Sequence, residues 1–259
     1  MNIEKIAFTI FLALWVLNSG SDAQSRIYRS GGGEIILSSA QVRYSWVDGP
    51  VYVETSPRFT LFFHTQQLIN LDLNNQIGLF AGAAIRNVGI IMEDHYQFLG
   101  FVDSDNEHWN NDVKVKRRSY SLGFPIALKL GAVQKSYFLY AGGEYEWMFH
   151  YKQKLFVDGV KKGKESEWTS SRVNSWIPSV FAGVQFPGGL NLKVKYYLND
   201  FLNTGYRGED FGQPVDYSGF ESTGMWYISM AMILNREQVK KIREGKMPYS
   251  WSAYRSMEP

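Results

Sequence analysis

Two glutamates and a histidine stand at alternate positions of one segment, and residues of these types could do acid–base chemistry. Glu144, Glu146 and His150 fall on one side of an extended chain, because side chains two residues apart share a face. A histidine paired with an acid, with a serine close by, can hydrolyse lipid or peptide bonds. The sequence singles out no such serine, so we predict that the protein is not an enzyme. Catalysis at this histidine stays open as an alternative.

A second group of polar residues precedes residue 112 and has the oxygen atoms that divalent cations prefer. Its spacing does not match an EF-hand loop, so we expect a solvated acidic loop, no metal site and no cofactor. The chain has no cysteine, which excludes a disulfide, a thiolate nucleophile and a cysteine-linked lipid. The group comprises Asp94, His95, Asp103, Asp105, Glu107 and His108.

The rest of the 259-residue chain fits one domain and indicates how these residues are positioned. Residues 1–23 are typical of a secretory signal: Lys5 precedes an apolar run over 6–17, and Ser21 and Ala23 form a cleavage site. A retained membrane anchor is the alternative, although this run is too short to span a bilayer. Without residues 1–23 the chain has 26 basic and 23 acidic side chains, so we expect no nucleic-acid partner.

Apolar and polar residues alternate with a period of two, which predicts β-strands. In residues 136–152 the odd positions are apolar or aromatic, and the even positions carry the charges. Most segments exceed the roughly 9–11 residues that a strand needs to cross a membrane. The expected strands are 34–47, 58–73, 76–91, 114–130, 136–152, 172–186, 190–198 and 222–234, of which 58–73 is the least regular.

Alternation alone does not separate a membrane barrel from a soluble β-sandwich or a lipocalin-like barrel, whose apolar face points inward. Short turns alternate with long polar loops at 92–112, 155–169 and 201–221, as in outer-membrane barrels. Aromatic residues near strand ends predict an interfacial girdle of Trp46, Trp147, Tyr151, Trp176 and Trp226. We therefore predict an all-β fold, a closed antiparallel up-and-down transmembrane β-barrel of eight strands over residues 34–234.

Charged residues on the polar faces would point into the lumen, which in an eight-stranded barrel is just wide enough for side chains. A buried charge must be paired, so we expect a structural ion-pair network and keep a small pore as an alternative. The expected members are Arg43, Arg86, Arg117, Lys129, Glu144, Glu146, Lys193 and Lys195.

Three short stretches carry a family resemblance: residues 87–91 (NVGII), 121–125 (SLGFP) and 195–203 (KYYLNDFLN). On these stretches the chain resembles the PorT-like outer-membrane β-barrel proteins of Bacteroidota, which are related to the OmpA-like small barrels. The likeness covers roughly residues 33–234 and implies a barrel in the outer membrane of a Gram-negative bacterium. Members serve in type IX protein secretion, in assembly of other membrane proteins and in unknown roles, so the resemblance implies no single activity.

Two segments flank the predicted barrel: residues 24–33 before it and a tail, residues 235–259, after it, both expected in the periplasm. Asn235 and Gln238 predict the cap of a short helix. The tail is expected either to dock on a partner or to stay solvated as a basic helix. Its apolar residues are Val239, Ile242, Tyr249, Trp251 and Tyr254.

The third external loop is basic, because it holds Lys152, Lys154, Lys161, Lys162 and Lys164. These charges would either contact lipopolysaccharide phosphates or keep the loop soluble. We predict a non-enzymatic accessory or interaction subunit, in protein export or outer-membrane assembly, that meets outer-membrane lipids, lipopolysaccharide and protein partners. An enzyme at the external rim and a small pore are the alternatives.

Overall fold

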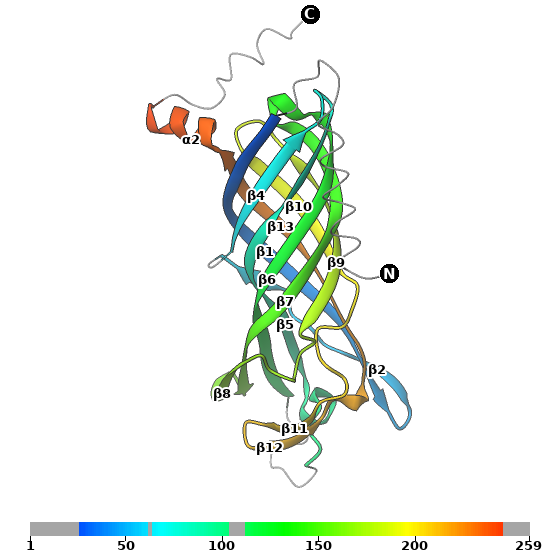
Figure 1. Ribbon diagram of the computed structural model, residues 1–259. Coiled ribbons are helices and arrows are strands. Elements are labelled where there is room, and N and C mark those ends of the chain that lie inside the picture. The colour runs from blue at the N-terminus through cyan, green and yellow to red at the C-terminus, as the bar shows by residue number, and fades with distance from the viewer. Residues whose placement is uncertain (1–25, 62–63, 104–111, 246–259) are drawn as a thin grey trace, which may run out of the picture.

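A computed structural model describes residues 26–245 except 62–63 and 104–111. Its main sheet closes on itself, because β1 (Arg26–Trp46) pairs with β13 (Phe220–Asn235) as well as with β4 (Thr65–Asp72) (Figure 1). Between β4 and β13 the ring keeps chain order through β5 (Ile77–His95), β6 (Asp112–Ala132), β7 (Tyr137–Val157), β9 (Trp176–Gln185) and β10 (Leu190–Tyr197). The predicted closed, antiparallel, up-and-down barrel of eight strands is confirmed.

The strand between β1 and β5 is broken, as the weak alternation over 58–73 indicates. β2 (Gly49–Val53), β3 (Arg58–Thr60) and β4 follow one another along β1. At the interruption the guanidinium of Arg58 donates to the backbone and side-chain oxygens of Asn87, at 2.9 and 2.8 Å. A side chain thus supplies hydrogen bonds where a continuous strand would have supplied its backbone.

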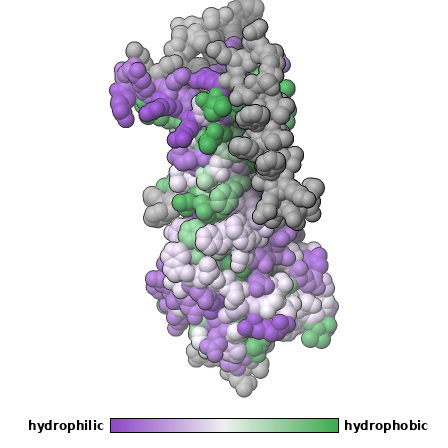
Figure 2. Space-filling model, in the orientation of Figure 1, coloured by the Kyte–Doolittle hydropathy of each residue, from purple (hydrophilic) through white to green (hydrophobic). Residues whose placement is uncertain are grey.

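The barrel wall carries an apolar belt on its outer surface. On β6 its members are Phe124, Ile126, Leu128 and Leu130, all of them exposed. The ten residue steps from Leu130 to Tyr120 rise roughly 25 Å, at about 3.3 Å per residue and a tilt of about 40°. This is the height of the lipid-facing band of a membrane barrel. Figure 2 shows hydrophobic side chains on the wall between hydrophilic surfaces near α2 (Arg236–Arg243) and at the opposite end.

Two neighbouring strands pass from lipid to water in different ways. On β6 the outward positions change from Leu122 and Tyr120 to Arg118 and Lys116, so the strand stays regular. On β7 the odd positions stay mostly apolar, and a β-bulge leaves Phe149 without a partner on β6. A bulge of one residue exchanges the two faces of a strand. The apolar residues of β7 therefore face lipid below the bulge and the interior above it.

The loops fold over one end of the barrel, which we call the loop end. β7 turns at Asp158 and Gly159, which both have positive φ, into β8 (Val160–Trp168). β11 (Arg207–Asp210) and β12 (Gln213–Asp216) form a second hairpin. These segments cover a hydrophobic core that includes Ile90, Met92, Leu99, Phe101, Val115, Leu155, Val215 and Tyr217. The expected polar loops 155–169 and 201–221 are therefore largely hairpins, and β5 extends the wall to His95 inside the expected loop 92–112.

The opposite end, which we call the turn end, has short connections and holds both termini of the barrel (Figure 1). β1 begins at Arg26, so residues 26–33, expected to precede the barrel, are part of its wall. α2 starts at a capping box in which Asn235 and Gln238 each accept the backbone N–H of the other at 2.9 Å, as predicted.

Val239 and Ile242 of α2 are exposed. Tyr249, Trp251, Tyr254 and the signal segment 1–23 lie outside the described residues. No helix of the described chain is long and apolar enough to cross a bilayer.

Candidate functional site

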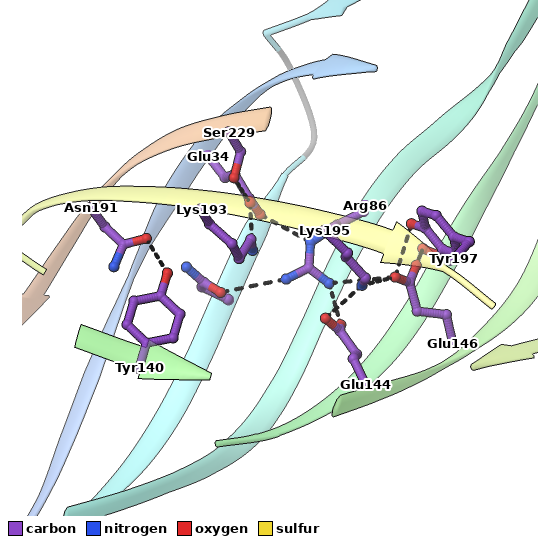
Figure 3. A network of polar contacts seen from close by, with 12 residues as sticks. Glu34, Arg86, Tyr140, Glu144, Glu146, Asn191, Lys193, Lys195, Tyr197 and Ser229 are labelled. Atoms are coloured by element: carbon purple, nitrogen blue, oxygen red, sulfur yellow. Dashed lines mark hydrogen bonds and ion pairs between the residues drawn. The ribbon is translucent and has the colours of Figure 1, made fainter. Parts of the chain in front are cut away.

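The lumen holds a compact ion-pair cluster, which we call the lumen network (Figure 3). Arg86 on β5 lies at its centre: Nε donates to Glu34 at 2.9 Å, and the other arm of the guanidinium contacts Glu144. Lys193 lies 2.6 Å from the second oxygen of Glu34, and Lys195 lies 2.7 Å from Glu144. The members are Glu34, Arg86, Glu144, Glu146, Lys193 and Lys195, all buried.

The lumen network balances three positive charges against three negative ones, so no net charge is buried. Hydroxyl groups satisfy the remaining lone pairs. Ser229 donates to Glu34, while Ser121 and Tyr197 donate to Glu146. A buried ion pair is tolerated only with such geometry and such additional hydrogen bonds. The arrangement therefore holds four strands of the wall together and leaves none of these carboxylates free for catalysis.

Three carboxylates were missed by the sequence prediction, although a charge imbalance indicated that they exist. The predicted set had six cations and only two glutamates, so four cations lacked a partner. Glu34 pairs with Arg86 and Lys193, Asp72 with Lys129, and Asp210 with Arg117. Since a charge is buried only when it is paired, the missing anions had to lie elsewhere in the chain.

Asp210 anchors the β11–β12 hairpin to the loop end of the barrel. Its carboxylate lies 3.5 Å from Arg117 and accepts a hydrogen bond from Arg172 Nε at 2.6 Å and another from the Tyr217 hydroxyl. Burial alone would raise the pKa of Asp210, but attraction to Arg117 and the bonds from Tyr217 and Arg172 outweigh it and hold the pKa below its ordinary value of 3.8. The hairpin is therefore tied down by a charged aspartate.

The structure places the predicted lumen residues in the interior with one exception. Arg86, Arg117, Lys129, Glu144, Glu146, Lys193 and Lys195 are buried. Arg43 points outward, with 44% of its side chain exposed, and pairs with Glu221 on β13. The alternation near Val42 and Tyr44 explains the difference, because these two apolar residues take the inward positions of β1.

The lumen is closed on both sides of the network. Towards the loop end it is filled by the hydrophobic core under the hairpins. Towards the turn end it is narrowed by aromatic residues, among them Phe80, Phe138, Tyr140 and Phe181. A cavity of about 40 Å³ remains there and reaches Gln238 of α2. This space has room for a few water molecules only, so the described residues leave no continuous aqueous path.

His150 and Glu146 do not meet. The bulge at Phe149 turns His150 to the outer surface, where its ring lies 4.7 Å from Trp168 and 5.8 Å from Tyr120. Glu146 is buried in the lumen, where it binds Lys195 and Tyr197. The His–acid pair, which the sequence left open as an alternative, does not form, because the alternation along β7 is interrupted at the bulge.

The predicted aromatic girdle is found only in part. Trp147, Trp176 and Trp226 lie on the outer wall, and the rings of Trp147 and Trp176 stack at 6.2 Å. Trp46 packs edge-on against Phe98 at 5.2 Å, beside the hydrophobic core of the loop end. Tyr151 is buried and donates to Gln153, because it follows the β-bulge.

The lysines of the expected third loop lie on the β7–β8 hairpin, where Lys161, Lys162 and Lys164 are exposed and Lys152 and Lys154 partly so. In the acidic segment before residue 112, Asp105, Glu107 and His108 lie outside the described residues. Within the described residues no three histidines or carboxylates gather as metal ligands would.

Several solved β-barrel structures resemble the fold at low sequence identity. The attachment invasion locus protein Ail of Yersinia pestis, solved with the heparin analogue sucrose octasulfate, is 13% identical with a TM-score of 0.33; the match covers 80% of this chain and 99% of Ail. Neisserial surface protein A is 10% identical (TM-score 0.30; 81% and 97% covered). The outer membrane protein OprG of Pseudomonas aeruginosa is 12% identical (TM-score 0.28; 80% and 95% covered). No family model and no curated protein matches the chain.

Proposed function

We propose that this chain is a non-enzymatic β-barrel of the Gram-negative outer membrane that works as an accessory subunit of a larger assembly. The apolar belt supports the membrane location, and the short turns and large loop-end hairpins support an orientation with the loop end outside. The termini and α2 then lie in the periplasm. The PorT-like resemblance favours a role in protein export or in assembly of the outer membrane of a Bacteroidota cell.

The sealed lumen carries this proposal. Every charge of the lumen network is paired inside the barrel, and a hydrophobic core fills the lumen above it. Among the described residues such a barrel has no route for a solute, and the carboxylates of its lumen network are all engaged by cations. The surfaces that remain available for binding a partner are the loop-end hairpins and the periplasmic helix.

α2 is the surface that we assign to a protein partner in the periplasm. It extends from the barrel rather than lying against the wall (Figure 1), and it exposes Val239 and Ile242 beside basic side chains. Apolar side chains on a short polar helix cost less free energy when a partner covers them.

The test is extraction of a tagged copy in mild detergent, with the mass and composition of the particle as the readout. The wild type should come out in a stoichiometric complex. Val239→Ser with Ile242→Ser should release a partner, whereas the matched change of two exposed valines at the loop end, Val47→Ser with Val160→Ser, should keep it. Extraction of the wild type as a lone particle of barrel size would contradict the proposal.

A further inference from the structure

Cations line up in two rows across the outer face of β6, β7 and β8. The first row pairs Arg118 with Lys152, and the second pairs Lys116 with Lys154 and Lys154 with Lys164. We call these five residues the basic face. Strands in a sheet lie about 4.8 Å apart, so each row sets like charges beside one another, an arrangement that destabilises a sheet.

The basic face keeps most of its positive charge: Lys116 helps to lower the pKa of Glu93, but the carboxylate of Glu93 is bound at 2.8 Å by Lys114, which is not part of the face. None of its five residues lies in an ion pair with a described carboxylate. Glu165 and Glu167 alternate with Lys164 on β8 and point to its other face, where Arg172 pairs with both, at 3.6 and 2.7 Å. The two faces of the β7–β8 hairpin therefore differ in charge, with Glu165 and Glu167 turned towards Arg172 and the cations turned outward.

The basic face begins where the apolar belt ends. One row below Arg118 and Lys152 lies a row of rings, in which Tyr120, His150 and Trp168 are paired across the same three strands. The ring of His150 lies 4.7 Å from that of Trp168. Aromatic rings of this kind occupy the boundary between acyl chains and headgroups. The two rows of cations above it stand at headgroup height and face sideways, along the membrane.

We propose that the basic face binds the phosphate groups of an outer-leaflet glycolipid, whose acyl chains lie against the belt below. Phosphate oxygens complement a cluster of guanidinium and ammonium groups, and the guanidinium of Arg118 can hold two of them. A lipid fits the position better than a free anion, because only a lipid has acyl chains that can contact the aromatic row and the apolar wall beneath it. The choice of leaflet rests on the proposed orientation, whereas the phosphate site itself does not.

The test titrates the purified barrel in detergent with phosphorylated lipid A, followed by native mass spectrometry. The variant is Arg118→Gln with Lys152→Gln, and the matched control is Lys161→Gln with Lys162→Gln at the exposed hairpin tip. Dephosphorylated lipid A and inorganic phosphate serve as separate probes. Folding of each variant is verified by its heat-dependent shift in gel mobility, so that lost binding is not confused with lost structure.

The wild type and the control should bind phosphorylated lipid A alike, and the Arg118/Lys152 variant should bind roughly 30-fold more weakly, since each cation near a charged lipid surface contributes about a factor of five. Equal binding by the variant and the control, or equal binding of dephosphorylated lipid A, would overturn the proposal. Inorganic phosphate binding as tightly as the lipid would overturn the assignment to a lipid.

A separate measurement tests the leaflet. Protease added to intact cells should cleave the β7–β8 hairpin if the basic face meets the outer leaflet. Cleavage only after the outer membrane is opened would overturn this part. The lipid titration uses the purified barrel without protein partners, so its failure is distinguishable from failure of the accessory role, and the protease measurement reports the orientation of the barrel alone.

Discussion

Replacing Arg86 by glutamine tests whether the lumen network stabilises the barrel. Arg86 joins Glu34 and Glu144, and both partners are buried. Its removal leaves three carboxylates facing two lysines, with one negative charge uncompensated in the lumen. Breaking a buried pair by removing one partner costs about 3–5 kcal/mol, so the free energy of unfolding should fall by about this amount.

The assay is urea unfolding of the barrel in lipid vesicles, followed by tryptophan fluorescence. Arg43→Gln is the matched control, because it removes the same side chain from a solvent-exposed pair with Glu221. Exposed pairs contribute less than about 1 kcal/mol. The double variant Arg86→Gln with Glu144→Gln restores charge balance, since Lys195 still contacts Glu146 and Lys193 still contacts Glu34. It should be more stable than the single Arg86 variant.

Two outcomes would refute this reasoning. In the first, the Arg86 and Arg43 variants lose the same small free energy, which would mean that water reaches the network. In the second, the double variant loses the sum of its two single losses, which would mean that charge balance does not matter.

Three further changes test the lumen network, the β11–β12 hairpin and α2. Gly123→Ala should lower the free energy of unfolding by about 1–3 kcal/mol, because the new methyl overlaps Glu144. Gly143→Ala is the control and should change this free energy little, because the nearest atom to its new carbon is Ser179 O at 3.6 Å. Equal losses in the two variants would argue against a tightly packed network. The protection of residues 207–219 against hydrogen exchange, taken relative to the intrinsic rate at each pH, should be high at neutral pH and fall as the pH drops from the ordinary Asp210 pKa of 3.8 through its lower folded value, because protonation removes stabilisation that the charged form supplies. Asp210→Asn should lose this protection at neutral pH, and full protection in that variant would show that Asp210 does not tie down the hairpin. Asn235→Ala should cost α2 about 1 kcal/mol, seen as faster exchange of residues 236–243 with unchanged barrel unfolding; unchanged exchange would show that the capping box contributes nothing.

The sequence predicts the barrel because lipid contact imposes a simple rule on each strand. In β6 from Tyr120 to Leu130, and in β10, every second residue is apolar and faces outward, and the structure follows this pattern. The rule fails where the outer surface meets water. The odd positions of β7 remain mostly apolar beyond Phe149, and nothing in their alternation marks the bulge that turns them inward. The error over Tyr151 and His150 has this single cause.

The hairpins of the loop end were not predicted, although the sequence contains a local signal for one of them. Asp158-Gly159 lies between two alternating segments, which is the strongest short-range sign of a hairpin. The polar residues around it conceal the signal, because Lys and Glu there face water on one side and Arg172 on the other. The contact between Asp210 and Arg117 has no local signal, since it joins strands far apart in the chain.

Electrical recording across a planar bilayer tests the sealed barrel most directly. The purified wild type, reconstituted beside a porin of known conductance as a positive control, should give no conductance steps at low voltage. In the part of the chain that the structure describes, the lumen network and the hydrophobic core above it leave ions no path. Steady, ohmic steps that depend on the amount of inserted barrel would contradict the account and restore the small pore as its function.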